Sequence, residues 1–185
     1  HVLELGWRAQ PTPELSYSLT LFHHEHGRLR SVAPTAQGPQ FQNGIEGRTR
    51  GLEAWSRWRP LPHWRVAAGL VTQRQSLRVR AGAVDAGGMP SLGNDPEHWW
   101  SLRSSLDLTQ RLGWDVSLRR VGARPQPLVP AYTALDMRLA WAALPTLEVA
   151  LALHNVGDPG HAEWGPPANR AELQRTAQLQ LHWRH

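Results

Sequence analysis

The stretch LSYSLTLFHHEH, residues 15–26, changes character halfway along. From Leu15 to Leu21 apolar side chains alternate with serine and threonine, and three histidines and a glutamate follow. Strict alternation places the apolar side chains on one face of a β-strand and the polar ones on the other. The segment therefore predicts a strand with one apolar face, which leaves its apolar surroundings near His23.

The same period-two pattern recurs along the 185-residue chain, whereas helical periodicity is hard to find. It predicts nine strands, at about residues 2–10, 15–27, 41–58, 63–79, 98–109, 113–123, 131–143, 147–156 and 173–185. Tight turns such as Pro60-Leu61-Pro62 alternate with longer segments rich in Gly, Pro and Asn, at about 28–40, 80–97, 124–130 and 157–172. This predicts an all-β, antiparallel, up-and-down meander with its tight turns at one end.

Composition removes several function classes. Cysteine is absent, so disulfides and thiolate chemistry are excluded. The 20 basic residues are all arginine and are scattered singly, which disfavours nucleic-acid binding despite the net charge of +5. No apolar run is long enough for a transmembrane helix, which does not exclude a membrane barrel. Since His1 already lies in a strand pattern, we expect a processed product or a piece of a longer chain.

Two classes of protein fit the pattern: a soluble barrel or sandwich with its apolar face inward, and an outer-membrane barrel with its apolar face toward lipid. The apolar segments run about 7–11 residues, near the length that a tilted strand needs to cross a bilayer. The opposite face carries charges on many strands, which suits a polar lumen. The residues assigned to that lumen are Glu53, Arg57, Arg103, Asp107, Arg119, Asp136, Arg138 and Glu148.

Six of the ten tryptophans share a common position in this pattern. Each lies within a few residues of the tight-turn end of its strand and has the parity of the apolar face. Indole rings settle at the interface between lipid and water, so the set predicts the lipid-facing aromatic girdle of a membrane barrel. The six are Trp7, Trp58, Trp64, Trp114, Trp141 and Trp183.

Several segments, in the same order, resemble strands of TonB-dependent outer-membrane receptors of the siderophore-receptor type. They are FQNGIEGRTRGLEAWSRWRP (41–60), SLRSSLDLTQRLGWDVSLRRVG (101–122), VPAYTALDMRLAW (129–141), LEVALALHNVGDPGHAEWG (147–165) and the closing strand. The resemblance implies that residues 1–185 are the C-terminal portion of a transmembrane β-barrel of about 22 strands, with long extracellular loops and short periplasmic turns. The plug domain and early strands are then absent. The chain departs from the family in ending on Trp183-Arg184-His185 and in having Asn155-Val156 in place of Asn-Leu.

The resemblance implies transport rather than catalysis. A complete receptor of this family lies in the outer membrane of a Gram-negative bacterium. It binds a scarce nutrient, above all a ferric siderophore, and admits it with energy passed from TonB through the missing N-terminal part. Its expected partners are outer-membrane lipid and lipopolysaccharide, the nutrient, TonB, and the barrel-assembly machinery, which would meet the C-terminal strand AQLQLHWRH (177–185). We expect no cofactor and no nucleic-acid partner.

The histidine cluster remains open between two interpretations. His23 has the outward parity, whereas His24 and His26 have the lumen parity, so at most two of the three can converge. A solvated strand rim and a contact to a ferric ligand, free metal or lipid phosphate both fit, and we expect no structural metal site. The segment GHAEWG (160–165) is a second candidate. The residues assigned to ligand contact at the extracellular rim and loops are His24, His26, His98, Trp99, His161, Glu163 and Trp164.

Three rival functions stay open at this point. A passive porin would share the barrel but lack the plug. A soluble β-sandwich binding module would bury its leucines between two sheets. An outer-membrane enzyme barrel would need a nucleophile or an acid pair at its rim. No motif for nucleophilic catalysis, phosphate binding or a His-Glu-x-x-His metal site is present in the sequence, so we expect no enzyme.

Overall fold

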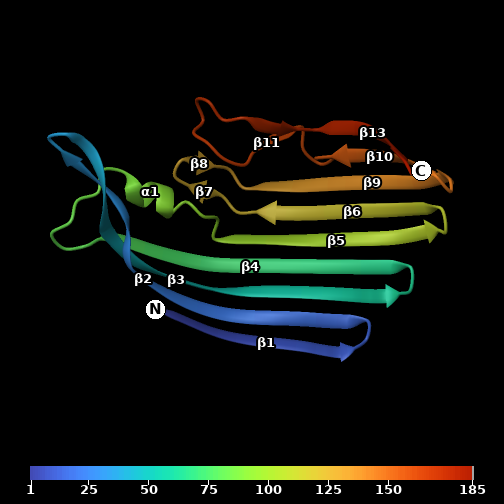
Figure 1. The fold of residues 1–185 in the computed structure, drawn as a ribbon, viewed down its shortest axis with the longest axis horizontal. Helices are drawn as coiled ribbons and strands as arrows, with labels where there is room; N and C mark the ends of the chain where they lie inside the picture. Colours follow the sequence, from blue (N-terminus) through green and yellow to red (C-terminus); the bar gives the residue numbers. More distant parts are fainter. Residues whose placement is uncertain (185) are drawn as a thin grey trace.

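The computed structural model describes residues 1–184 and is dominated by one antiparallel sheet of nine strands (Figure 1). The strands follow one another across the sheet in chain order, and the remaining short strands lie outside it. The nine are β1 (Val2–Thr12), β2 (Leu15–Thr35), β3 (Gly38–Leu61), β4 (Trp64–Val79), β5 (His98–Thr109), β6 (Leu112–Val121), β9 (Tyr132–Leu144), β10 (Leu147–His154) and β13 (Thr176–Trp183). The predicted meander of nine strands is confirmed.

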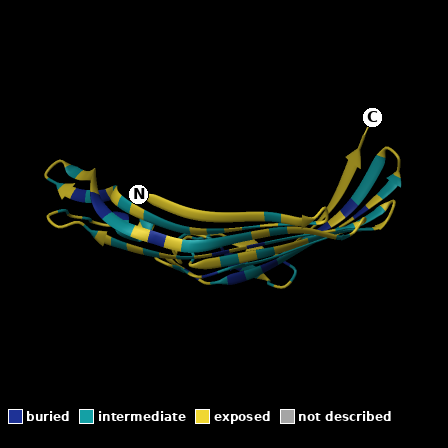
Figure 2. Ribbon diagram, turned by 90° about the horizontal axis from the view of Figure 1, so that it is seen from below, coloured by how far each residue is buried: buried dark blue, intermediate teal, exposed yellow. Residues whose placement is uncertain are grey.

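The sheet is curved but not closed. Its two edges are β1 and β13, and the N- and C-terminal ends of the chain lie at opposite edges in Figure 1. Figure 2 shows the sheet from the side as a single bent layer with most of its surface exposed or half-buried. An open sheet leaves unpaired backbone groups along both edges, which fits a segment of a larger barrel better than a finished one.

No second sheet packs against this layer in the part of the chain described. Leu19, Leu139 and Leu181 lie on one face and remain 37%, 43% and 69% exposed. A β-sandwich would bury such residues between its two sheets. The structure therefore does not favour the rival interpretation as a soluble sandwich.

The segment 28–40, which the sequence predicts to be a loop, instead extends the hairpin between β2 and β3. Pairing continues past a bulge near Leu29 to the last pair, Thr35 and Gly38. Gly38 has φ 107°, a left-handed conformation that glycine adopts without a steric cost. Ser31 is fully buried in this arm, and its hydroxyl accepts a hydrogen bond from the backbone N–H of Gly44 at 2.9 Å. Because backbone pairing resumes after the bulge and continues from Ser31 to Thr35, the arm forms a projecting ribbon rather than an irregular loop.

The next connection, residues 80–97, is tied to this arm by Asp85. Its carboxylate accepts backbone hydrogen bonds from Val32 at 2.9 Å and from Gly88 and Met89 at 2.8 Å. These N–H donors, above all that of Met89 and then that of Val32, lower the pKa of Asp85 below its ordinary value. The carboxylate therefore fixes both the start of α1 (Gly88–Leu92) and its position on β2.

The other long connections contain short hairpins. β7 (Arg124–Pro125) pairs with β8 (Leu128–Val129), and β11 (Gly160–Ala162) pairs with β12 (Glu172–Gln174). Helix is limited to the five residues of α1 within residues 1–184, as the sequence predicts. In that described part, no helix has both the length and the apolar character needed to cross a membrane.

Candidate functional site

The strand register sorts the side chains of the main sheet into two faces. Residues paired across neighbouring strands point to the same side, so each face can be followed from β1 to β13. One face, called here the charged face, holds all eight side chains assigned to the lumen: Glu53, Arg57, Arg103, Asp107, Arg119, Asp136, Arg138 and Glu148. The opposite face, called here the Trp face, holds Trp7, Trp58, Trp64, Trp114, Trp141 and Trp183.

The tight-turn end of the charged face carries a network of ion pairs. The Arg65 guanidinium donates two hydrogen bonds to Asp107, at 2.9 and 3.0 Å. Arg138 donates to Glu148 at 2.5 Å and lies 3.7 Å from Asp115. These pairs cross from β4 to β10 and balance arginine against carboxylate. The result is a polar wall of paired arginines and carboxylates, which suits contact with water or a polar surface.

At the long-loop end, the same face holds a cluster that joins β6 and β9 to the loop strand β11. The rings of Tyr132 and His161 stack at 4.0 Å and 14°. Arg119 lies over the Tyr132 ring at 5.6 Å and donates a hydrogen bond to Glu163 at 2.6 Å. His161 is only 8% exposed, and its Nε2 lies 3.3 Å from Glu163. This cluster fastens the loop that follows β10 against the sheet.

The candidate segment 160–165 therefore has two kinds of residue. His161 and Glu163 point onto the sheet, where stacking and a charge-assisted hydrogen bond hold them. Trp164 is 53% exposed, and no aromatic stacking partner for it is found among residues 1–184. His161 and Glu163, rather than Trp164, anchor this loop on the sheet.

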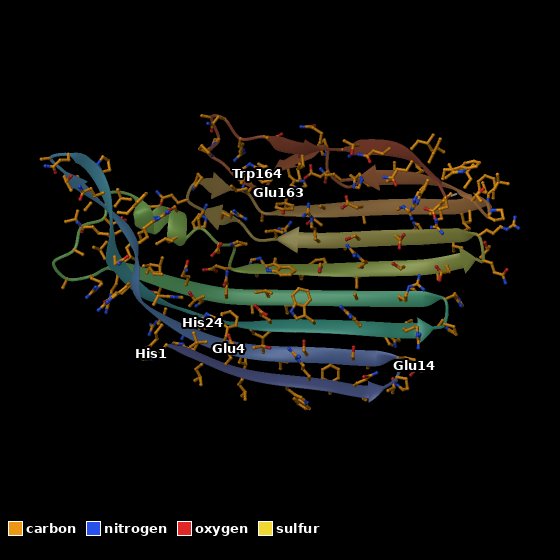
Figure 3. All side chains as sticks on the ribbon, in the orientation of Figure 1. His1, Glu4, Glu14, His24, Glu163 and Trp164 are labelled. Atoms are coloured by element: carbon orange, nitrogen blue, oxygen red, sulfur yellow. The ribbon has the colours of Figure 1, made fainter. Side chains whose placement is uncertain are left out.

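The histidines of β2 separate by parity, as predicted. His24 and His26 lie on the charged face with their rings 6.3 Å apart, whereas His23 lies on the Trp face, 3.7 Å from Glu25. His24 Nε2 is 3.1 Å from Glu4 of β1, beside which it stands in Figure 3, well away from Glu163 and Trp164. Among residues 1–184, no group of three or more His, Asp or Glu side chains is arranged to hold a metal ion.

His98 and Trp99 are neighbours in the chain but point to opposite faces. His98 is paired with Thr72 on the Trp face, and Trp99 with Val71 on the charged face. Trp99 packs against Trp55 with ring centroids 5.3 Å apart. Trp55 is not among the candidates that the sequence suggests. Its position in the alternation nevertheless places it on the face opposite the girdle tryptophans, and this was the signal that could have identified it.

Trp55 lies flat on the charged face because Gly69 stands opposite it on β4. A Cβ atom at position 69 would come within 2.1 Å of the Trp55 ring. Phe22 covers Gly51 in the same way. These large side chains lie over glycines and therefore lie flat against the charged face.

Comparison with known proteins agrees on the fold. No protein-family model matches the chain, and no curated protein sequence is similar to it. Among solved structures, the chain is similar to the ferric-catecholate import receptor Fiu from Escherichia coli K12, with a TM-score of 0.75 and 18% identity. It is also similar to the siderophore receptor PiuA from Acinetobacter baumannii, with 0.76 and 15%, and to the FrpB iron transporter from Neisseria meningitidis, with 0.77 and 13%.

Each of these alignments covers 98% of this chain but only 27%, 28% and 30% of the respective receptor. The chain thus spans less than a third of the structures that it matches. Its nine antiparallel strands, in unbroken order and with open edges, correspond to part of a larger barrel. The chain has the fold of the C-terminal part of the β-barrel of TonB-dependent receptors.

Proposed function

We propose that the protein is part of an outer-membrane receptor that takes up a scarce nutrient, with a ferric siderophore as its substrate. In this proposal the Trp face meets lipid and the charged face lines the lumen. A plug domain and the segment that contacts TonB belong to a part of the receptor outside residues 1–185. The substrate would meet the charged face at its long-loop end, where His24, His26 and Trp99 lie.

The observation that carries the proposal is the slope of the tryptophan line. Trp7 is paired with Leu19, whereas Trp58 is paired with Leu15, so Trp58 lies four residues nearer the tight-turn end of the sheet. Steps of two residues in the same direction follow at Trp64, Trp141 and Trp183, while Trp114 shares the row of Trp64. From Trp7 to Trp183 the shift is about ten residues over the width of the sheet, which is a slope of roughly 40° at ~3.3 Å per residue and ~4.8 Å per strand.

Strands of membrane barrels tilt by about 35–45°. If the strands tilt by that angle, the six indoles lie at one depth in the membrane, which is the arrangement of an interfacial girdle. A soluble sheet has no requirement that links the positions of tryptophans on six strands to one tilt angle. The slope therefore supports the membrane interpretation independently of any resemblance.

The test uses the complete receptor in its own bacterium. Cells grown under iron limitation should take up ⁵⁵Fe-labelled siderophore, and uptake should fall to background when either the receptor gene or TonB is removed. Uptake that persists without TonB would favour a passive channel. A receptor that is absent from the outer-membrane fraction would overturn the proposal as a whole.

A further inference from the structure

Three arginines form a cluster on the Trp face, at the end of the sheet away from the tight turns. Arg50 of β3 and Arg74 of β4 are directly opposite each other in the register. Arg48 occupies the next position of the same face on β3, opposite Ser76. All three side chains are exposed and line one shallow concavity, together with Gln75, Ser76 and Glu97. Arg48, Arg50 and Arg74 are called here the arginine cluster.

Among residues 1–184, no carboxylate forms an ion pair with this cluster, although Glu97 lines the same concavity. Like charges directly opposite on neighbouring strands destabilise a sheet. Glu25 is paired with Arg48 in the register, but its carboxylate lies 3.7 Å from His23 and forms no ion pair with the arginine. Within residues 1–184, none of the three guanidiniums forms a salt bridge or a side-chain hydrogen bond. A bound anion would offset the repulsion between Arg50 and Arg74.

The height of the cluster is that of the second membrane interface. On β4 the Trp face runs from Trp64 through Val66, Ala68 and Leu70 to Thr72 and Arg74. Trp64 and Arg74 are about ten residues apart, which is roughly 33 Å along the strand and roughly 25 Å along the membrane normal at a tilt of ~40°. The apolar band of a membrane barrel is about 25 Å tall. If the tryptophans mark one interface, the arginine cluster lies at the other.

The polar boundary on neighbouring strands shifts in the same direction as the tryptophan line, toward the tight-turn end from β3 to β6. Arg50 and Arg74 are directly opposite each other. His98 is opposite Thr72, which is two residues nearer the tight-turn end than Arg74. Arg120 is opposite Trp100, which is two residues nearer that end than His98. From β3 to β6 the two boundaries of the apolar band are therefore inclined in the same direction. The arginine cluster belongs to the edge of this band and not to a loop above it.

We propose that the arginine cluster binds the phosphate group of an outer-leaflet lipid, which in an outer membrane is lipopolysaccharide. Guanidinium groups hold phosphate oxygens through paired, charge-assisted hydrogen bonds. The acyl chains of the same molecule would lie along the apolar positions below, at Leu52 and Leu70. The inference rests on the proposed function, because only a membrane orientation brings lipid to this face.

The experiment uses the complete receptor, purified in detergent, with three probes: lipid A carrying both phosphates, dephosphorylated lipid A, and inorganic phosphate. Binding is measured by native mass spectrometry. Substitution of all three arginines by glutamine should weaken binding of the phosphorylated lipid by about tenfold or more, since each charge-assisted hydrogen bond lost costs about that factor. The dephosphorylated lipid should bind wild type and the triple variant equally.

Arg78→Gln is the matched control. Arg78 lies on the same face of β4 and is exposed, but its guanidinium is paired with Glu46 at 2.8 Å. This variant should bind the phosphorylated lipid as wild type does. Equal binding by wild type and the triple variant would overturn the inference, as would inorganic phosphate binding as tightly as the lipid.

The same preparations separate this inference from the proposed function. A receptor that inserts into the outer membrane and transports its substrate, yet keeps its lipid binding after the triple substitution, refutes only the lipid site. A wild-type receptor that does not reach the outer membrane refutes both. Transport by the triple variant should equal that of wild type, because the cluster lies on the face opposite the proposed lumen.

Discussion

Substituting Gly69 by alanine should destabilise the barrel through one contact. The new Cβ would lie 2.1 and 2.4 Å from two carbons of the Trp55 ring, far inside van der Waals contact. Trp55 must then leave its position against Trp99, 5.3 Å away. Inserting a methyl group into a packed position costs about 1–3 kcal/mol, and an aromatic pair contributes about 0.5–1.5 kcal/mol beyond its buried area. We expect a loss of about 2 kcal/mol in the free energy of unfolding.

The assay is urea unfolding of the complete receptor in lipid bilayers, followed by the heat-modifiable shift on gels. Trp55→Ala removes the obstructing ring, so Gly69→Ala should cost close to nothing in that background, and the double-mutant cycle should show a coupling of about 1–3 kcal/mol. Gly113→Ala is the control, because its Cβ would meet only Asp107 Oδ1, at 4.0 Å. Equal costs for Gly69→Ala with and without Trp55 would refute the proposed contact.

Three further predictions follow from the other end of the sheet and from its loops. The pKa of Asp85 is lowered in the folded protein, so its contribution to stability is complete above its unfolded-state pKa and is lost as the pH falls through its folded-state pKa. Hydrogen exchange of residues 80–97 should therefore rise below about pH 4. Asp85→Asn should abolish that pH dependence. Leu181→Asp should reduce the heat-modifiable folded fraction more than Trp183→Asp, because a charge facing lipid costs about 2–4 kcal/mol for Arg or Lys at the midplane, less for Asp, and less again near the interface; normal assembly of Leu181→Asp would reverse the assignment of the two faces. Zinc titration of the complete receptor should show no tight site that depends on His24 and His26, and tight binding lost in the double alanine variant would contradict this.

Period-two alternation predicts the face of a side chain but not its neighbour. The parity of Trp58 and Arg57 follows from the local pattern alone, and both lie on the expected faces. The contact between Trp55 and Trp99 depends on how β3, β4 and β5 are aligned, and that register is set by turns far away in the chain. The same limit explains why Glu163 was assigned to the rim and Arg119 to the lumen without any prediction that the two form a hydrogen bond.

The arm formed by β2 and β3 shows a second limit. Residues 28–40 contain the glycine and proline that usually mark a loop, and Pro34 and Pro39 are even paired with each other in the extended hairpin. The ribbon persists because Ser31 and Asp85 satisfy backbone groups that a loop would leave to water. Ser31 is 13 residues from the backbone group that it satisfies and Asp85 is 53 residues from Val32, so local composition cannot reveal these contacts.

The closing strand shows what each kind of information supports. Leu179, Leu181 and Trp183 are paired with Leu151, Val149 and Leu147 of β10, so they share the Trp face. The expectation that His185 stands where an aromatic residue is usual concerns a residue outside the described part, 1–184. On the far side of β13 the chain presents backbone groups with no partner among the described residues. In the proposed membrane barrel, lipid could not satisfy those groups, so another strand would have to pair there. The expected assembly machinery would use the same exposed edge with its apolar face. Barrel closure and assembly would therefore both require the unpaired edge of β13. Leu181→Asp tests the apolar face of this strand without removing a backbone hydrogen bond.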